Sequence, residues 1–243
     1  MKKLREIKRV GKDAFLQQYG KAVLLMFLVS LIPIVSVWAL TILGVNFLLR
    51  LWLFVQLDLL RVISVTISLV ALIVFLFLAQ CVLHVGSCSA FLTITKKQKM
   101  EMFKMFDGFK NFGNSLGGML WMILWIFLWS FLFIVPGIIK YYAYFMTPYL
   151  LADNPRVLGA DAVELSKRMM KGKKGKLFLI QLSFIGWFFL SVLTLGILWV
   201  TYVGPYFNSV MAEYYNKAKE DALIKGYVTQ DELLGAELHS LDA

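Results

Sequence analysis

The chain has 243 residues, of which 60% are hydrophobic and 16% are charged, and its mean hydropathy is +0.73. A soluble domain carries about a quarter charged residues, so this composition excludes an ordinary soluble protein and predicts an all-α integral membrane protein. The net charge of +10 comes from basic residues that flank apolar runs, which argues against a soluble nucleic-acid-binding face.

Residues 1–21 are predicted to form a basic amphipathic helix. Its apolar stripe has near-helical spacing and consists of Leu4, Ile7, Val10, Ala14 and Phe15. Its cations are Lys2, Lys3, Arg5, Lys8, Arg9 and Lys12. Such a helix lies on the inner leaflet, where each cation contributes about 1 kcal/mol of attraction to anionic lipid. Anchoring and orientation of the chain are the favoured interpretation, and specific lipid sensing is the alternative.

Six apolar segments follow, and they define a predicted membrane domain over residues 22–216. We expect spans at approximately residues 22–43, 62–83, 116–135, 136–154, 177–195 and 197–215. The fourth is the weakest, because its apolar part over 138–152 reaches only about 22 Å at 1.5 Å per residue. Extending it from Pro136 to Asn154 gives about 28 Å, close to a hydrocarbon core of roughly 30 Å.

The six segments group into three copies of one weak pattern. Each copy has a basic amphipathic segment, a long apolar helix, a break and a second apolar helix. The breaks in the second and third copies are predicted at Pro136-Gly137 and at Gly196. The simplest architecture for this pattern is three helical hairpins, each preceded by a basic amphipathic segment in the cytoplasm. Internal duplication is a hypothesis, since residue identity between the copies is low.

The distribution of basic residues predicts the orientation. Segments assigned to the cytoplasm hold 22 of the 25 Lys and Arg residues, and the assigned outside loops hold only Arg50, Arg61 and Lys140. Because basic loops stay inside, both chain ends are expected in the cytoplasm, with residues 217–243 as a short helical tail. Leaving residues 136–154 on the outer surface would also place the cations from Lys167 to Lys176 outside, so six spans are preferred over four.

Two further cytoplasmic segments carry patterned cations. Residues 100–113 predict a second amphipathic helix, with Met102, Phe103, Phe106, Phe109, Lys104 and Lys110. Residues 160–176 predict a helix that ends at Gly172, inside a Lys- and Gly-rich run. This run lacks the spacing and the Ser or Thr of a phosphate-binding loop, so a basic stop before the fifth span is the favoured interpretation.

Cations of the N-terminal helix and of the Lys- and Gly-rich run are the candidate contacts for anionic lipid headgroups or for an acidic partner protein. These candidates are Lys8, Arg9, Lys12, Lys171, Lys173, Lys174 and Lys176. If they act beyond topology, they do so at the cytoplasmic surface, where such partners would be met.

Few ionisable or reactive side chains lie inside the predicted spans. His84, Lys140 and Glu213 all lie near span ends, and no charge is predicted at mid-membrane, which disfavours ion-coupled transport. Cys81 and Cys88 would lie roughly 10 Å apart along one helix, too far for a disulfide. No nucleophile with a base, cofactor motif or metal-ligand spacing is present, so we expect no enzymatic activity, no cofactor and no metal.

The second half of the chain resembles a bacterial membrane-protein family. The residues that carry the resemblance are Pro136-Gly137-Ile138-Ile139-Lys140, Tyr144, Asn154-Pro155, Ala162, Ser166, Met170, Gly172, Lys174, Leu177-Phe178, Leu182-Ser183-Phe184-Ile185-Gly186-Trp187, Thr194-Leu195-Gly196-Ile197, Pro205-Tyr206 and Glu213-Tyr214-Tyr215. Together with the N-terminal Gly20-Lys21-Ala22, they are similar to the domain of unknown function 975 family of bacterial integral membrane proteins. The resemblance implies a multi-span protein of the bacterial cytoplasmic membrane, and it supplies no activity.

Two kinds of function fit these features. The first is a non-enzymatic membrane module that engages anionic lipid or a partner protein at the cytoplasmic face, because the patterned polar residues lie there. The alternative is a small transporter or a permease subunit of an exporter, which the prolines in the spans and the hairpin repeat motivate.

Overall fold

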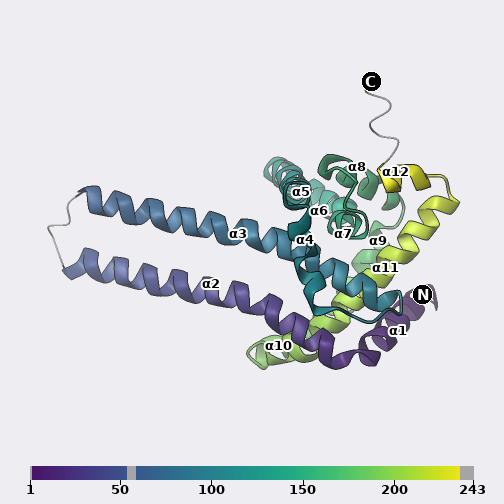
Figure 1. The fold of residues 1–243 in the computed structure, drawn as a ribbon, viewed down its shortest axis with the longest axis horizontal. Coiled ribbons are helices and arrows are strands. Elements are labelled where there is room, and N and C mark those ends of the chain that lie inside the picture. Colours follow the sequence, from purple (N-terminus) through teal and green to yellow (C-terminus); the bar gives the residue numbers. More distant parts are fainter. Residues whose placement is uncertain (1, 54–58, 236–243) are drawn as a thin grey trace, which may run out of the picture.

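The computed structural model describes residues 2–53 and 59–235, and helices are the regular secondary structure throughout those ranges. Two long helices, α2 (Tyr19–Leu53) and α3 (Leu59–Thr95), extend as a pair of arms from a bundle of shorter helices (Figure 1). At 1.5 Å per residue each arm is about 50 Å long, more than the roughly 30 Å of a membrane core. The all-α fold predicted from the composition is confirmed.

The shorter helices pack together at the root of the arms. In chain order they are α1 (Lys2–Gln17), the 3₁₀-helix η1 (Met102–Phe106), α4 (Asp107–Lys110), α5 (Phe112–Leu132), α6 (Ile134–Tyr144), α7 (Thr147–Asp153), α8 (Gly159–Met169), α9 (Lys174–Leu182), α10 (Ile185–Leu193), the π-helix η2 (Trp199–Val203), α11 (Gly204–Ile224) and α12 (Gln230–Leu234). Most buried apolar side chains of the described residues belong to one cluster, which draws on α1, the root of α3, α7, α8 and α11. The bundle is therefore one packing unit.

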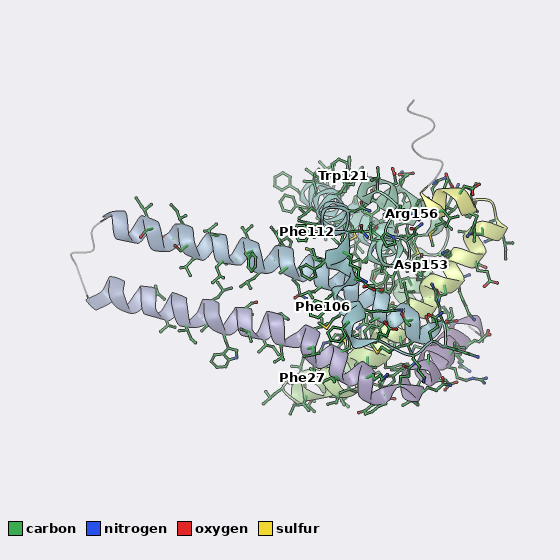
Figure 2. The ribbon with its side chains drawn as sticks, in the orientation of Figure 1. Phe27, Phe106, Phe112, Trp121, Asp153 and Arg156 are labelled. Atoms are coloured by element: carbon green, nitrogen blue, oxygen red, sulfur yellow. The ribbon has the colours of Figure 1, made fainter. Side chains whose placement is uncertain are left out.

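Four stretches are long and apolar enough to cross a membrane, which indicates a multi-pass membrane protein. They are Tyr19–Ile42, Thr66–Thr95, Phe112–Leu132 and Lys174–Leu193, and they correspond to the first, second, third and fifth predicted spans. Many of their large apolar side chains are exposed, among them Phe27 and Trp121, and Figure 2 shows side chains projecting outward along both arms. Such surfaces suit contact with lipid.

The second span extends further than the sequence predicts. The prediction ends it at residue 83, before a run of small and polar residues, whereas α3 continues as one helix to Thr95. Ser87 and Thr93 do not interrupt it, because their hydroxyls donate to backbone carbonyls of the preceding turn at 2.7 and 3.0 Å. The helix ends where the charged residues Lys96 and Lys97 form a turn.

The second hairpin reverses at a different residue from the one predicted. Phe133 has an extended backbone (φ −155°, ψ 140°) and separates α5 from α6, while Pro136 and Gly137 lie inside α6. Pro136 fits there because it sits in the first turn, where its missing N–H costs no helical hydrogen bond. The dipeptide therefore belongs to a helix start, and the predicted break at Pro136-Gly137 is wrong.

The predicted fourth span, 136–154, is interrupted. α6 ends at Tyr144 and α7 begins at Thr147, so neither helix has the length of a span. Buried Ser166 of α8 satisfies the backbone here, since its hydroxyl donates to the Ala143 carbonyl at 2.9 Å and accepts from the Met146 N–H at 3.1 Å. The interruption is held by a specific side chain from another helix.

The third hairpin reverses where the sequence predicts. Leu195 and Gly196 have left-handed backbones (φ 52° and 84°) between α10 and η2, and a left-handed position after a helix favours glycine. The N–H of Gly196 closes the turn on the Ser191 carbonyl at 2.8 Å. The predicted sixth span, 197–215, differs from a lipid-facing helix, because Val210 and the next five residues are buried in the bundle and α11 continues to Ile224.

The N-terminal amphipathic helix forms as α1, and most of its apolar face packs within the protein. Ile7, Ala14 and Phe15 are buried, and α1 packs along α11. The Phe15 ring lies 5.7 Å from that of Tyr202, centre to centre. Arg9 stays on the exposed side of the helix. The amphipathic pattern thus serves packing within the protein, because α11 offers a surface for the apolar stripe.

Residues 100–113 do not form the second amphipathic helix that the sequence predicts. Met105 and Gly108 are buried where η1 and α4 pack on α3, which holds the segment as two short turns. The phenylalanines nevertheless gather on one exposed ridge, in which Phe103 is 82% exposed. The rings of Phe106, Phe109 and Phe112 follow one another at centre distances of 6.3 Å.

Candidate functional site

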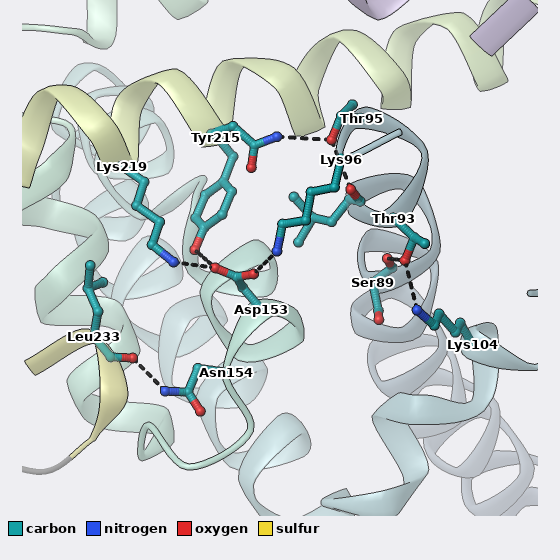
Figure 3. Close-up of polar contacts among 12 residues, drawn as sticks. Ser89, Thr93, Thr95, Lys96, Lys104, Asp153, Asn154, Tyr215, Lys219 and Leu233 are labelled. Carbon is teal, nitrogen blue, oxygen red and sulfur yellow. Dashed lines mark hydrogen bonds and ion pairs between the residues drawn. The ribbon is translucent and has the colours of Figure 1, made fainter. Parts of the chain in front are cut away.

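Asp153 joins three helices at the root of the bundle (Figure 3). It ends α7, and its carboxylate accepts a hydrogen bond of 2.6 Å from Lys96, just after α3. Lys219 of α11 donates to the other oxygen, and the Tyr215 hydroxyl lies 3.1 Å from it. The Asp153 side chain is only 8% exposed, and a buried carboxylate needs cations and donors of this kind around it. The contact fixes the ends of α3 and α7 on α11.

The N-terminal segment is bound to the connection between α3 and η1. The Gln18 side-chain amide donates to the Gln98 carbonyl at 2.7 Å and accepts from the Met100 N–H at 2.7 Å. The Lys21 ammonium also donates to the Met100 carbonyl at 3.1 Å. A further bond of 2.9 Å runs from Asn216 of α11 to Thr95 at the end of α3. These contacts bring residues 18–21, 95–100 and 216–219 to one end of the bundle.

The loop after α7 binds both α5 and α12. The Asn114 side chain of α5 donates to the Pro155 and Val157 carbonyls, the first at 3.0 Å. Asn154 donates to the Leu233 carbonyl at 2.6 Å. Where α5 and α8 begin, the backbones touch, because a Cβ on Gly159 would overlap the backbone of Gly118. These contacts join residues 154–159 to the end of the bundle where Asp153 binds Lys96 and Lys219.

Arg168 and Glu232 form an ion pair of 2.7 Å between α8 and α12. Glu232 also closes a capping box with Thr229, since its carboxylate accepts from the Thr229 N–H at 2.8 Å. Burial alone would raise the pKa of Glu232, but the Thr229 N–H and Arg168 outweigh it and lower that pKa below its ordinary value of 4.5. The C-terminal helix is thus held to α8 by charge.

The structure places the predicted cationic contacts in two groups. Lys8, Arg9 and Lys12 lie on α1, and Lys171, Lys173, Lys174 and Lys176 lie around the start of α9. The Lys8 ammonium lies 4.9 Å above the centre of the Phe184 ring, between α9 and α10, and partial burial lowers the pKa of Lys8. Lys173 is buried and donates to the Ala218 carbonyl at 2.8 Å. Lys171 lies 5.6 Å from the centre of the Tyr227 ring.

One cavity lies between α1, α9 and α11, and two cations of the second group, Lys173 and Lys176, line it. Its volume is about 330 Å³, and its lining includes Leu4, Ile7, Lys173, Lys176 and Lys217. The predicted contacts Lys8, Arg9, Lys12, Lys171 and Lys174 are not among the residues that line it. The sequence did not indicate Lys217, because only the packing of α11 beside α1 and α9 brings it here.

A second cavity, of about 200 Å³, lies near the surface of the bundle, since His84 and Tyr141 at its walls are both exposed. Its walls come from α3, α5, α6, α7 and α11, and they include His84, Tyr141, Tyr149 and Asn208. Asn208 donates to the Gly204 carbonyl at 2.9 Å, one turn earlier in α11. His84 therefore lies at a cavity wall instead of within a packed helix contact.

Metal and disulfide chemistry find no support in the part of the chain that the structure describes. Within residues 2–53 and 59–235, no three His, Cys, Asp or Glu side chains gather as metal ligands would. Cys81 and Cys88 are both buried free thiols.

Residues 132–222 match the family described as "Protein of unknown function (DUF975)". The match runs from the end of α5 to the last turns of α11, and so it includes Asp153, Lys176 and Lys217. No curated protein and no solved structure matches the chain. The N-terminal Gly20-Lys21-Ala22 lies outside the matched range. The resemblance predicted from the sequence is thus shown as a match to the DUF975 model over residues 132–222, and the function of that family is unknown.

Proposed function

We propose that the protein is a non-enzymatic module of the bacterial cell membrane that engages anionic lipid or a partner protein through a cytoplasmic polar face. The observation that carries the proposal is the convergence of four polar segments at one end of the bundle. These segments are residues 2–21, 96–111, 154–176 and 216–235, and the hydrogen bonds and ion pairs described above join them. Their cations consequently share one face.

We further propose six passages in three hairpins, with both ends of the chain inside. The reversals between α2 and α3, at Phe133 and at Leu195-Gly196 support this arrangement. The return limbs are α6 with α7, and η2 with the first half of α11. A broken or buried helix can serve as a return limb, because neighbouring helices shield its polar groups from lipid. The basic polar face then lies inside, as the distribution of Lys and Arg favours.

The phenylalanine ridge supports engagement of lipid. It belongs to the connection between two span-length helices, which end at Thr95 and begin at Phe112. A short connection of this kind stays close to the membrane surface. Exposed rings beside Lys104 and Lys110 suit the boundary between headgroups and acyl chains.

Lipid selectivity tests the proposal. Spin-labelled phosphatidylglycerol should associate more strongly than spin-labelled phosphatidylcholine with the reconstituted protein, and added salt should weaken that preference. Replacing Lys171, Lys174 and Lys176 together by Gln should reduce the preference several-fold. The matched triple replacement by Arg keeps the charge and should retain it. Equal association of both lipids with the wild-type protein would refute engagement of anionic lipid.

The second cavity supports the alternative of a small transporter or permease subunit. His84, Tyr141, Tyr149 and Asn208 are polar groups around a space among apolar helices, where a solute could bind. Flux of candidate solutes into proteoliposomes tests this alternative. Transport that His84→Ala and Asn208→Ala abolish, while the matched exposed substitution Thr41→Ala leaves it intact, would favour it over the lipid-engaging module.

A further inference from the structure

We infer that the cavity between α1, α9 and α11 binds the phosphate-bearing headgroup of one anionic phospholipid. The inference rests on the proposed engagement of anionic lipid and assigns it to one site. Lys173, Lys176 and Lys217 line the same cavity as the apolar side chains of Leu4 and Ile7, and Asp221, which lies 3.9 Å from the Lys173 ammonium, lines it as well. Ammonium groups beside apolar side chains complement an anionic phospholipid, in which a negative phosphate lies next to apolar acyl chains.

The cavity lies at the depth where headgroups lie. Lys176 is in the first turns of the span-length stretch Lys174–Leu193, and Leu179, one turn further on, also lines the cavity. Leu179 is 51% exposed, and Leu182 is exposed on the next turn of α9. These side chains form an apolar path from the cavity along α9, which an acyl chain can follow. Free phosphate would leave that path unused.

The size of the cavity fits a headgroup. A volume of about 330 Å³ equals about ten to eleven water molecules at about 30 Å³ each. A phosphoglycerol group has about that number of non-hydrogen atoms. A whole phospholipid does not fit, so the acyl chains must lie outside, against α9.

The lysines differ in how firmly they are held. Lys173 donates to the Ala218 carbonyl and lies 3.9 Å from Asp221, so it forms a fixed wall. Lys176 is exposed and lies at the edge of the cavity. The first backbone N–H groups of α9 add partial positive charge beside it.

Lys217 has an exchangeable partner. Its ammonium lies 3.5 Å from Glu6 of α1 and 3.9 Å from Glu213 of its own helix. The Glu6 side chain is 61% exposed and can turn into solvent, whereas the Glu213 side chain is only 10% exposed. A phosphate entering the cavity can therefore replace the Glu6 carboxylate beside Lys217. Glu6 competes with the lipid, and removing its charge should strengthen binding.

Native mass spectrometry of the full chain in detergent tests the site through opposite effects of two variants. Wild-type protein should retain one phosphatidylglycerol with higher affinity than phosphatidylcholine. Lys176→Gln should weaken phosphatidylglycerol binding about tenfold, as expected for loss of one charged hydrogen bond. Glu6→Gln should strengthen it several-fold. Lys99→Gln removes an exposed cation elsewhere on the polar face and should change this affinity little.

The possible failures are distinguishable. If Lys176→Gln and Lys99→Gln weaken binding equally and Glu6→Gln has no effect, the polar face attracts lipid but this cavity is not the site. If the wild-type protein shows no preference for phosphatidylglycerol, the proposed engagement of anionic lipid fails together with the inference. Displacement of the lipid by millimolar inorganic phosphate would overturn the choice of a lipid ligand. Unchanged melting temperatures of the three variants establish that folding is intact.

Discussion

Lys96 and Asp153 are 57 residues apart in the chain, yet the Lys96 ammonium donates to the Asp153 carboxylate at 2.6 Å. The same carboxylate binds Lys219, so one acidic group holds the turn after α3, the end of α7 and helix α11 together. The polar face depends on this contact for its geometry. Its removal should therefore loosen several segments at once.

Replacing Asp153 by Asn should lower the free energy of unfolding by about 2 kcal/mol. The substitution leaves two ammonium groups without their carboxylate, and their partial exposure keeps the loss below that of a fully buried pair. Thermal unfolding of the purified protein in detergent measures the effect. Asp107→Asn breaks the exposed pair with Lys110 and should cost less than about 0.5 kcal/mol. Equal losses of unfolding free energy for both variants would show that Asp153 does not hold these segments together.

The close approach of α5 and α8 gives a second prediction. Gly159→Ala should destabilise the protein by about 2–3 kcal/mol, because the new methyl group meets the backbone of Gly118 and one helix must move. Gly117→Ala, one residue before the contact, meets no atom within 4 Å and should be neutral or stabilising by up to about 1 kcal/mol. Chemical denaturation compares the two variants. A neutral Gly159→Ala would mean that the helices do not touch here.

The interruption between α6 and α7 depends on one hydroxyl. Ser166→Ala should cost about 1–3 kcal/mol, because the buried Met146 N–H loses its partner while the Ala143 carbonyl loses a donor. Thermal unfolding is again the measurement. Ser183→Ala is the control, since the exposed Ser183 hydroxyl bonds only within its own helix. The idea fails if the two alanine variants melt at the same temperature.

Acidification should release α12. The pKa of Glu232 is lowered in the folded protein, so its contribution to stability is present above the ordinary pKa of 4.5. That contribution is lost as the pH falls from about 4.5 through the lower, folded pKa. The protection of the α12 amides against hydrogen exchange, relative to their intrinsic rates at each pH, should therefore fall in that window. Glu232→Gln should remove this pH dependence and exchange faster at neutral pH. An unchanged acid response in the variant would assign it to another group.

Hydropathy and charge predicted the features that depend on local sequence. The four span-length stretches, the N-terminal helix and the reversal at Gly196 follow from apolar length, amphipathic spacing and the left-handed preference of glycine. These properties belong to single segments, so one sequence suffices to recognise them. The number of membrane passages cannot be predicted in this way, because a helix that passes through the membrane inside the bundle does not need an apolar outer surface.

Other features depend on residues that are distant in the chain. The interruption before Thr147 needs the hydroxyl of Ser166, and a hydropathy profile cannot register that partner. The apolar stripe of α1 has the same pattern whether it meets lipid or α11. Lys217 enters the candidate cavity only because α11 packs beside α1 and α9. The sequence therefore indicated two lysines that line the cavity, Lys173 and Lys176, but not the cavity itself.

Cysteine accessibility tests the central claim, that the polar segments share the cytoplasmic side, at one position in each of three segments, 96–111, 154–176 and 216–235. In a chain with Cys81 and Cys88 replaced by Ser, single cysteines would replace Lys99, Lys176 or Lys225 on the polar face, and Val135 or Leu195 at the hairpin reversals. A membrane-impermeant maleimide applied to intact spheroplasts should label the two reversal positions, and the three polar positions only after permeabilisation. Labelling of any polar position in intact spheroplasts, or a division of these three between the two sides, would contradict the account.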